Sequence, residues 1–441
     1  MQETSNNLKW SRFNFIIENN KGFFLYNSYS NCLLNLSPEI NALCCRLRDG
    51  LCHYEDFLSD EEYKYFRDNY ILVEEDDDLV ETLHMHSMAR LYSNKSFVLT
   101  IAPTHNCNYA CSYCYEHHRT SKPMNDSTGQ AIVDYVKHLK EENGLEVLYI
   151  TWYGGEPLLQ IERVCSLSKK LCELGVNVQE NSIITNGYFL TKETLEKLKC
   201  SGINEIQITL DGDKQTHDTR RPLLNGGGSY DTIIRNLDSF FTNDYDKHFT
   251  LVVRVNIDKE NFESYAWTYN WLKARYKSYD FIVYPGVIVI NEDDSCSRNC
   301  MARNEVTDMF LDLYKKYKIT SERLYPDDIN IECKARSPYG SMLIGSQGEI
   351  YKCFEDLGKK DKIVGNINNH NKWSNYKELA RLATGIDHYT LKECKECPYL
   401  PICNGGCPIR RYENEYLGKH NDCCTPFKGR IEEYISLVLE Q

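Results

Sequence analysis

The sequence lacks long apolar runs. No stretch of its 441 residues approaches the roughly 20 consecutive apolar residues that a membrane-spanning helix needs. The first residues, Met1 to Leu8, are polar, and no apolar segment typical of a secretion signal follows them. We therefore expect a soluble, cytoplasmic protein with no membrane partner.

Positive charge is also scarce. The chain has 51 Lys and Arg residues against 64 Asp and Glu residues, a net charge of −13. An acidic chain has no general electrostatic attraction for nucleic acid or for anionic lipid. We expect no nucleic-acid partner. The sequence also contains no phosphate-binding P-loop, no serine nucleophile elbow and no metal-hydrolase motif.

Cysteine, by contrast, is abundant, with 20 residues. Disulfides are rare in a reducing cytoplasm, so clustered cysteines indicate metal or redox chemistry. The clusters lie at 107–114 and 394–407, with pairs at 296/300 and 423/424. We expect the cysteines outside such spacing to be small buried hydrophobic residues. These are Cys32, Cys44, Cys45, Cys52, Cys165, Cys172 and Cys200.

The first cluster has the spacing C-x3-C-x2-C, with Cys107, Cys111 and Cys114. An odd number of thiols cannot pair off as disulfides, and closed zinc sites usually have four ligands. Three thiolates would hold a 4Fe–4S cluster and leave one iron free to bind a small molecule. A zinc site or a group of buried thiols is the alternative that the spacing alone leaves open.

From Phe97 onward, predicted strands and helices alternate. The strands cover 97–102, 146–152, 181–185, 205–210, 249–257 and 281–290, with helices between them. This alternation predicts a parallel sheet with helices outside it. The cysteine loop, Gly154–Pro157, Asn186 and Asp211 each follow a predicted strand, where β/α barrels build their active sites. We predict an α/β fold with a partial, TIM-like (β/α)6 barrel over 96–291.

Two further domains flank the predicted barrel. Residues 1–95 read as two strands, a helix capped by Ser37, a second helix starting at Ser59 and a short strand, 71–73. This order suggests a winged-helix-like domain, in which we expect the acidic run 74–78 to be a solvated turn. Residues 292–441 carry many cysteines and few apolar runs, so we expect metal ligation to hold them.

The barrel motifs resemble those of the radical S-adenosylmethionine (SAM) enzymes. The resemblance rests on the cysteine spacing with an aromatic residue, Tyr113, before its last cysteine, and on the segment Gly-Gly-Glu-Pro at 154–157. It implies that Cys107, Cys111 and Cys114 hold a 4Fe–4S cluster whose free iron binds SAM. An electron then splits SAM into methionine and a 5′-deoxyadenosyl radical. The residues implied to contact SAM are Tyr113, Gly154, Gly155, Glu156, Pro157, Asn186, Asp211 and Arg221.

The roles that the resemblance implies differ among these residues. Glycines let a backbone approach closely, and the Glu156 carboxylate suits the amino group of SAM. Tyr113 would lie near the adenine, and Asn186 and Asp211 near the ribose or the amino-acid end. Arg221 ends an H-D-x-x-R pattern and would face the SAM carboxylate.

The C-terminal cysteines resemble those of the SPASM domain, which carries two auxiliary 4Fe–4S clusters. The matching patterns are G-x4-C ending at Cys353 and C-x2-C-x5-C-x3-C over 394–407. The resemblance implies three clusters in all. It assigns one auxiliary cluster to Cys394, Cys397, Cys403 and a late cysteine, Cys424 or else Cys423. It assigns the other to Cys333, Cys353 and Cys407, with Cys296 or Cys300 as a fourth ligand, or with one open iron.

Together these patterns predict a maturase for a ribosomally made peptide, similar to those of sactipeptides and ranthipeptides. We expect residues 1–95 to bind the leader of a cysteine-containing precursor peptide, and the radical to initiate thioether formation. We expect flavodoxin or ferredoxin as the electron donor. Alternatives are carbon–carbon crosslinking, epimerisation and an iron–sulfur electron carrier. Sulfatase maturation is another, although such enzymes carry Asp where this chain has Phe354.

Overall fold

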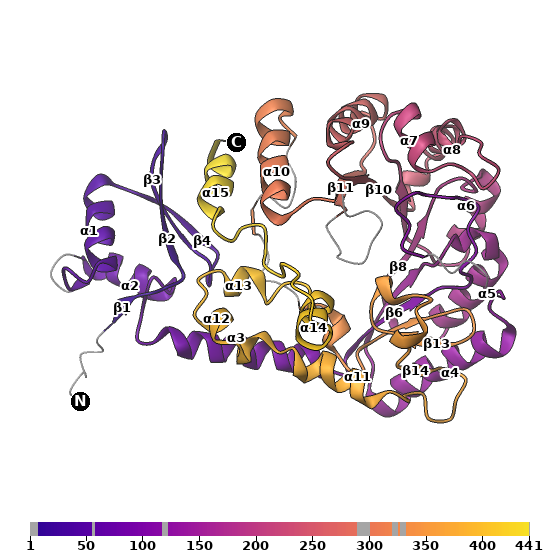
Figure 1. Ribbon diagram of the computed structural model, residues 1–441, viewed down its shortest axis with the longest axis horizontal. Coiled ribbons are helices and arrows are strands. Elements are labelled where there is room, and N and C mark those ends of the chain that lie inside the picture. Colours follow the sequence, from indigo (N-terminus) through magenta and orange to yellow (C-terminus); the bar gives the residue numbers. More distant parts are fainter. Residues whose placement is uncertain are drawn as a thin grey trace. The chain divides into compact units, whose positions relative to one another are not determined.

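The computed structural model describes residues 8–54, 58–116, 122–288, 300–319, 325–326 and 332–440 (Figure 1). The chain divides into two compact units that are each discontinuous in sequence. We call them the barrel unit, residues 91–302 and 334–385, and the terminal unit, residues 1–90, 303–333 and 386–441. The predicted domains, by contrast, are consecutive segments, and their boundaries stay a prediction.

The barrel unit is built on a sheet whose described strands follow the order β11-β10-β9-β8-β7-β6-β12-β13-β14. The strands β6 to β11 are parallel, which confirms the predicted alternation and the α/β fold class. They are β6 (Ser96–Ile101), β7 (Val147–Trp152), β8 (Asn177–Thr185), β9 (Glu205–Thr209), β10 (Thr250–Ile257) and β11 (Ile282–Val287).

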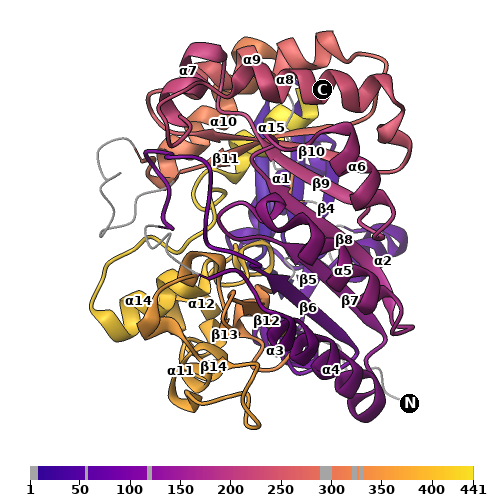
Figure 2. The same cartoon turned by 90° about the vertical axis from the view of Figure 1, so that its right-hand side faces the viewer.

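Helices accompany these strands along one face of the sheet (Figures 1 and 2). They are α4 (Asp126–Asn143), α5 (Ile161–Cys172), α6 (Lys192–Lys199), α7 (Lys214–Arg220), α8 (Tyr230–Thr242) and α9 (Phe262–Arg275). A further helix, α11 (Tyr376–Ala380), follows β14. Side chains on β7 alternate: Leu148, Ile150 and Trp152 are fully buried, whereas Tyr149 and Thr151 are only half-buried. The buried set suits the helix-covered face, and the other set leaves polar groups on the inner face of the partial barrel.

Strands β12 (Ser341–Ile344), β13 (Glu349–Tyr351) and β14 (Gly365–Asn366) extend this sheet beyond β6. They were not predicted, because β12 pairs in parallel with β6 across more than two hundred residues of sequence. The pairing sets Ile344 beside Ile101, the last residue before the cysteine loop. The β12–β13 hairpin therefore brings the G-x4-C segment, which ends at Cys353, beside that loop.

The terminal unit contains a three-stranded antiparallel sheet, β2-β3-β4, and a two-stranded ribbon, β1-β5. The capping predictions are confirmed: the Ser37 and Ser59 side chains accept from the backbone N–H groups of Ile40 and Glu62. Its elements are β1 (Lys9–Trp10), β2 (Asn14–Asn19), β3 (Gly22–Asn27), β4 (Cys32–Leu36), α1 (Pro38–Arg48), α2 (Asp60–Asp68), β5 (Leu72–Val73), α3 (Asp76–Leu91), α10 (Arg303–Tyr317), α12 (Lys392–Lys395), α13 (Leu400–Cys403), α14 (Pro408–Leu417) and α15 (Ile431–Glu440).

One local prediction in this unit is wrong. The acidic run 74–78 is no solvated turn, because α3 begins within it at Asp76. The Asp76 carboxylate is buried and accepts hydrogen bonds from the Ser11 hydroxyl at 2.8 Å and from the Arg12 N–H at 3.1 Å. Acidic side chains also suit the positive end of the helix dipole.

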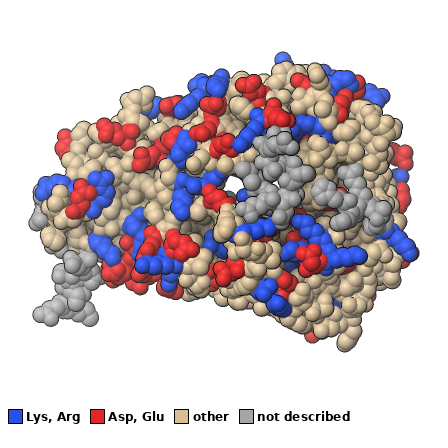
Figure 3. Space-filling model, in the orientation of Figure 1, with Lys and Arg blue, Asp and Glu red and all other residues tan. Residues whose placement is uncertain are grey.

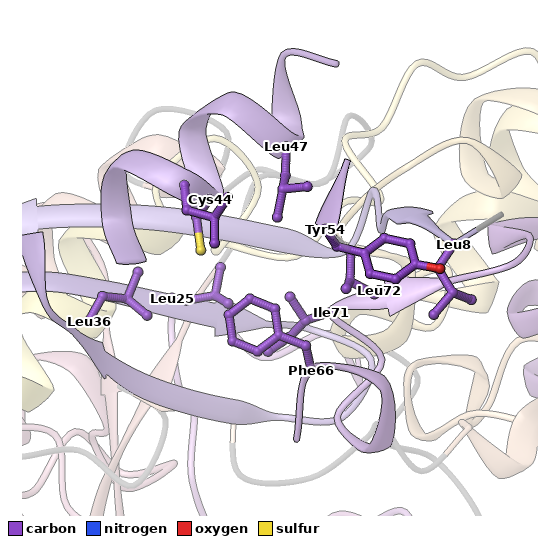
Figure 4. Close-up of a cluster of buried hydrophobic side chains, with 10 residues drawn as sticks. Leu8, Leu25, Leu36, Cys44, Leu47, Tyr54, Phe66, Ile71 and Leu72 are labelled. Carbon is purple, nitrogen blue, oxygen red and sulfur yellow. The ribbon is translucent and has the colours of Figure 1, made fainter. Parts of the chain in front are cut away.

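Both faces of the β2-β3-β4 sheet are covered. On one face, Leu25 and Leu36 pack with residues of α1 and α2, as Figure 4 shows. On the other, Ile17, Phe24 and Tyr26 pack against Ile402, Ile431 and Ile435, which lie in or beside α13 and α15. Strand β4 pairs with β3 on one edge, and no described strand pairs with its other edge.

Charged side chains of both signs are interspersed on the face of the molecule shown in Figure 3. Within the described residues, no helix combines the length and apolar character needed to cross a membrane.

The fully buried Leu25 gives a test of the terminal unit's core. Replacing it with Ala leaves a cavity between β3 and the helices, so we expect a loss of about 2–5 kcal/mol of stability. Thermal unfolding would show a lowered midpoint. The matched control is Leu51→Ala, because Leu51 is 68% exposed and its truncation should cost less than about 0.5 kcal/mol. Equal midpoints for the two variants would contradict this core.

Candidate active site and thiol pocket

The cysteine loop is held on one side by the segment 220–224. The Ala110 N–H donates to the Pro222 carbonyl at 2.8 Å, and the Ser112 N–H donates to the Arg220 carbonyl at 3.2 Å. The Leu224 N–H returns a bond of 3.0 Å to the Asn108 carbonyl. These backbone bonds tie the stretch that contains Cys107, Cys111 and Cys114 to the segment 220–224.

The Gly-Gly-Glu-Pro segment holds the same loop from its other side. The Gly155 N–H donates to the Thr104 carbonyl at 3.2 Å, and the Glu156 N–H donates to the Asn106 carbonyl at 2.9 Å. A Cβ atom on Gly154 would lie 2.4 Å from the Thr104 oxygen, and one on Gly155 would lie 2.4 Å from the Asn106 oxygen. The glycines are thus needed for close approach to the cysteine loop itself, a role that sequence reasoning had given to SAM binding alone.

Glu156 is fully buried and ties the ends of β7 and β8 together. Its Oε1 accepts from the Thr185 hydroxyl at 2.7 Å and from the Leu158 N–H at 3.0 Å, and its Oε2 accepts from the Asn186 N–H at 2.8 Å. Burial raises the pKa of Glu156, and these hydrogen bonds partly offset the rise. The predicted pairing with an ammonium group stays a prediction.

Tyr113 is the centre of a buried polar network. Its hydroxyl donates to Asp211 Oδ2 and accepts from Arg221 Nη1 at 2.6 Å and Asn256 Nδ2 at 3.0 Å. Burial raises the pKa of Tyr113 well above its ordinary value, so the phenol stays protonated. The structure therefore brings three predicted residues, Tyr113, Asp211 and Arg221, into direct contact, and it adds Asn256.

His217 holds the backbone of Asp211, one member of this network. Its Nδ1 accepts the Asp211 N–H at 3.2 Å, so its proton is on Nε2, which lies 3.1 Å from the Ser229 hydroxyl. Burial lowers the pKa of His217 to about 3, which keeps the ring neutral and this tautomer in place. His217 is therefore a positioning residue for Asp211.

Asn186 lies beside the first cysteine. Its Nδ2 donates to Asn108 Oδ1 at 2.7 Å and lies 4.0 Å from the Cys107 sulfur. The structure therefore places Asn186 within reach of the cysteine loop, as its position after β8 predicts.

Sequence reasoning missed Arg220, Asn108 and Asn256. Arg220 donates to Asp258 at 2.8 Å and its guanidinium lies over the Tyr113 ring. The only signal for Asn256 was a pair of polar residues, Arg254 and Asn256, at alternate positions of an otherwise apolar strand.

Several buried donors beside the cysteine loop and Tyr113 have no hydrogen-bond acceptor among the described residues, although Arg220 Nε lies 3.7 Å from Asp211 Oδ2. They are Asn108 Nδ2, Arg220 Nε and Nη2, and Arg221 Nε. Unpaired buried donors are costly, so their clustering indicates a ligand rich in acceptor oxygens. The carboxylate and ribose hydroxyls of SAM have this chemistry, and these residues fit it.

A second group of thiols lines a cavity of about 330 Å³ in the terminal unit. Two cations accompany the thiols: Lys428 Nζ lies 3.3 Å from the Cys424 sulfur, and Arg411 Nη2 lies 3.8 Å from the Cys394 sulfur. Burial raises the pKa of Cys403 to about 11, so without a metal this thiol is protonated at neutral pH. The lining cysteines are Cys394, Cys397, Cys403, Cys423 and Cys424.

The two adjacent cysteines at 423 and 424 have different neighbours. The charges that add to the raised pKa of Cys403 are those of Cys424, Cys397 and Cys394. Cys423 instead lies between Asn414 Nδ2 at 3.5 Å and the Asn421 carbonyl at 3.6 Å. This grouping favours Cys424 over Cys423 as the partner of the first three thiols.

A left-handed turn separates Cys403 from Cys407. Asn404, Gly405 and Gly406 have φ values of 45°, 76° and 69°. A Cβ atom on Gly405 would overlap the His388 ring, and one on Gly406 would overlap the Cys423 carbonyl. The turn therefore requires glycine at 405 and 406, and it is followed by Cys407 at the start of α14.

The remaining predicted ligands are not brought together in one unit. Cys333 and Cys407 belong to the terminal unit and Cys353 to the barrel unit. Cys300 is buried, and Cys296 lies outside the described residues. Within the described ranges, no three His, Cys, Asp or Glu side chains surround a single point as they would a lone metal ion.

Comparison with known proteins identifies the barrel. Residues 101–272 match the family model described as the Radical SAM superfamily. The chain carries a radical SAM domain. This family implies a 4Fe–4S cluster and SAM. The thiols of the cysteine loop suit the first of these cofactors, and the unpaired donor groups at the cysteine loop and Tyr113 suit the second.

The chain is similar to a serine-type anaerobic sulfatase-maturating enzyme of Klebsiella pneumoniae, with 22% identity over 322 residues, 68% of this chain and 79% of that protein. Its fold resembles native anSMEcpe solved with AdoMet (SAM) and the Kp18Cys peptide, with a TM-score of 0.57, 19% identity and coverage of 78% of this chain and 97% of the other. It also resembles Streptococcus suis SuiB bound to the precursor peptide SuiA, with a TM-score of 0.52, 16% identity and coverage of 95% and 98%.

The contact at Gly155 can be tested directly. In Gly155→Ala the new Cβ would collide with the His105 and Asn106 carbonyl oxygens, so the cysteine loop must shift. We expect loss of bound iron and SAM cleavage slowed by about 10²-fold. The control is Gly129→Ala in α4, where a Cβ meets Arg163 and Leu167 at 3.7 Å or more. Unchanged iron content in Gly155→Ala would contradict the role of this contact.

Asp356, near Cys353, gives a pH-dependent test. It is buried, and burial raises its pKa from 3.8 to about 6. A raised carboxyl pKa favours the protonated form in the folded state, so this stability is present at low pH and is lost as pH rises through about 6.

We expect Asp356→Asn to gain stability over the wild type as pH rises, by about 1–2 kcal/mol between about pH 5 and pH 8. Unfolding midpoints across this pH range would measure the gain. Asp134→Asn, at an exposed site on α4, should show no such trend. A constant difference across the range would contradict the burial of an ionisable Asp356.

Proposed function

We propose that the protein is a radical SAM maturase that forms thioether crosslinks in a ribosomally made, cysteine-containing peptide. The observation that supports the proposal is the thiol pocket of the terminal unit, because its five cysteines could hold a second iron–sulfur cluster besides that of the cysteine loop. A thioether bond replaces one S–H and one C–H bond. Its formation is a two-electron oxidation. One electron leaves with the hydrogen atom that the radical removes, and the other needs an acceptor.

The barrel unit would start the reaction. Cys107, Cys111 and Cys114 would hold the 4Fe–4S cluster, which with SAM supplies a primary carbon radical that removes a hydrogen atom from the peptide. Gly154 and Gly155 hold the loop in place. Arg220, Arg221 and Asn108 have unpaired donors that would bind the SAM oxygens. A flavodoxin or ferredoxin would deliver the first electron.

The terminal unit would take up the second electron. After loss of the hydrogen atom, the substrate thiol loses a proton and its sulfur bonds to the carbon, which leaves one electron to remove. Cys394, Cys397, Cys403 and Cys424 are the ligands that we propose for an auxiliary 4Fe–4S cluster. Lys428 and Arg411 lie beside two of these sulfurs and would offset their negative charge. A third cluster on Cys333, Cys353 and Cys407 remains part of the proposal.

The proposal of a peptide substrate has two supports. SuiB was solved with a precursor peptide and anSMEcpe with the Kp18Cys peptide, and this chain shares their fold. The outer edge of β4 also pairs with no described strand, so a leader peptide could add there as a fourth strand. Phe24 and Tyr26, which are core residues, would support that edge from within.

Sulfatase maturation is the second candidate, since the Klebsiella pneumoniae relative carries that name. It is less favoured because the residue after Cys353 is Phe354, whose ring packs against Tyr153 with centroids 4.8 Å apart. The resemblance to sulfatase-maturating enzymes implies an aspartate at this position. Asp356 is the nearest buried carboxyl group along the chain, three residues after Cys353.

The proposal is tested by anaerobic incubation of the reconstituted enzyme with SAM, reductant and the short cysteine-containing peptide encoded beside this gene. We expect each crosslink to remove two hydrogens and to block one cysteine against alkylation, as read by mass spectrometry. The same mass loss with free cysteines would reject thioethers and favour a carbon–carbon bond.

A matched peptide with each cysteine replaced by serine is the control, and it should not crosslink. An aldehyde that reacts with a hydrazide probe would instead support formylglycine formation. An unchanged peptide mass with active SAM cleavage would reject crosslinking of this peptide.

The different neighbours of Cys423 and Cys424 give a separate test. We expect Cys424→Ser to lose about four iron atoms per chain, one cubane cluster. Cys423→Ser, the matched neighbour, should retain this iron because its sulfur faces Asn414 and Asn421. Iron and sulfide analysis with electron paramagnetic resonance of the reduced proteins measures both. The reverse pattern would assign Cys423 as the ligand.

A further inference from the structure

Arg254 occupies the inner face of the partial barrel in a fixed pose. It lies on β10 opposite Tyr284 of β11, and its guanidinium carbon is 5.9 Å from the centre of the Tyr284 ring. Its Nε donates to Asn256 Oδ1 at 2.7 Å. Tyr284 is itself held by a 2.9 Å bond from its hydroxyl to Gln207 Oε1. Three neighbouring strands thus orient one guanidinium group.

Gly286 provides the space that this pose needs. A Cβ atom at this position would lie 2.3 Å from Arg254 Nε and 2.8 Å from Arg254 Cζ. Gly286 pairs with Asn256 across the strands, so the guanidinium extends toward the carboxyl ends of β10 and β11. This is the end at which Tyr113 and the cysteine loop lie, because Asn256 Nδ2 also donates to the Tyr113 hydroxyl.

The terminal nitrogens of Arg254 have no acceptor among the described residues. No carboxylate of the described chain lies within salt-bridge distance of them, and Nε makes the one hydrogen bond of this side chain. Other arginines in this unit are paired: Arg220 with Asp258 at 2.8 Å and Arg275 with Asp238 at 2.8 Å. The Nη1–Nη2 edge of a guanidinium matches a carboxylate in geometry and charge.

Other groups near Arg254 also belong to the candidate active site. Burial raises the pKa of Tyr153, and the positive charge of Arg254 partly offsets the rise, so the two groups are neighbours. The charges of Cys114 and Cys353 act on the same phenol. Through Asn256, which hydrogen-bonds to both Arg254 and the Tyr113 hydroxyl, Arg254 is also linked to the cysteine loop.

We propose that Arg254 binds a carboxylate of the substrate peptide and so selects which segment is presented to the radical. This inference rests on the proposed function, since it takes the substrate to be a peptide. An Asp or Glu side chain and the peptide's C-terminal carboxylate share the required chemistry. SAM is the competing ligand, but the unpaired donors of Arg220 and Arg221 at Tyr113 already match its oxygens.

The test uses the full-length reconstituted enzyme and the cysteine-containing peptide encoded beside this gene. Arg254→Gln removes the charge, Arg254→Lys keeps it without the forked geometry, and Gly286→Ala displaces the guanidinium while keeping it. Arg235→Gln is the matched control, because Arg235 lies exposed on α8 and, among the described residues, hydrogen-bonds only to Asp231 and Thr232 of its own helix. Peptide affinity is measured by fluorescence anisotropy and crosslinking by mass spectrometry.

We expect Arg254→Gln to lower kcat/KM for the peptide by about 10- to 100-fold, with Gly286→Ala in the same direction and Arg254→Lys between. Arg235→Gln should match the wild type. SAM affinity, measured by calorimetry, should not change in Arg254→Gln. Peptides with single Asp→Asn or Glu→Gln changes, and one with an amidated C-terminus, identify the carboxylate.

With the wild-type enzyme, one of these altered peptides should show the same loss of kcat/KM that Arg254→Gln shows with the native peptide. When Arg254→Gln acts on that altered peptide, the loss of kcat/KM should be no larger than for either change alone. Additive losses at every carboxylate would overturn the inference, and so would weakened SAM binding in Arg254→Gln. If all variants unfold at the wild-type temperature yet process the peptide equally, it is also overturned. If the wild type leaves the peptide unmodified, the proposed function itself fails.

Discussion

The close approach of two backbones is the contact on which the active site depends. Gly154 and Gly155 lie directly against the carbonyl groups of residues 104–106, so closely that any side chain would displace them. This contact joins the loop after β7 to the loop after β6, and Glu156 continues it to the loop after β8. Three strand ends thus share one rigid backbone junction, which presents the three thiols of the cysteine loop.

A buried polar network extends this junction across the barrel. Tyr113 leaves the cysteine loop and meets Asp211, Arg221 and Asn256, which come from three other segments. Neutral His217 holds the backbone of Asp211, and its lowered pKa keeps it neutral. Such a network is stable only when each of its polar groups has a hydrogen-bond partner. The donors that remain unpaired therefore indicate where a ligand binds. Hydrogen-bond donors that are already held in position can bind a ligand without a rearrangement of the protein.

The terminal unit positions its cysteines differently from the cysteine loop. Its pocket relies on helix ends and on a left-handed turn through Gly405 and Gly406, which separates Cys403 from Cys407. Among the thiols of this pocket, burial raises the pKa of Cys403 to about 11, so that thiol is protonated at neutral pH without a metal. A metal would convert them to thiolates, with Lys428 and Arg411 beside two of the sulfurs. The same unit contains the β2-β3-β4 sheet, whose second face packs on the segments flanking this pocket.

Local patterns in the sequence determined the strand and helix alternation of the barrel, the cysteine spacing, the Gly-Gly-Glu-Pro segment and the helix caps at Ser37 and Ser59. Each of these depends on residues a few positions apart, so spacing alone reveals them. The tertiary structure alone decided the addition of β12 beside β6, the contacts of Arg254 and Asn256 across β10 and β11, and the different surroundings of Cys423 and Cys424. These features depend on contacts between residues far apart in the chain, where neither periodicity nor motif spacing carries a signal.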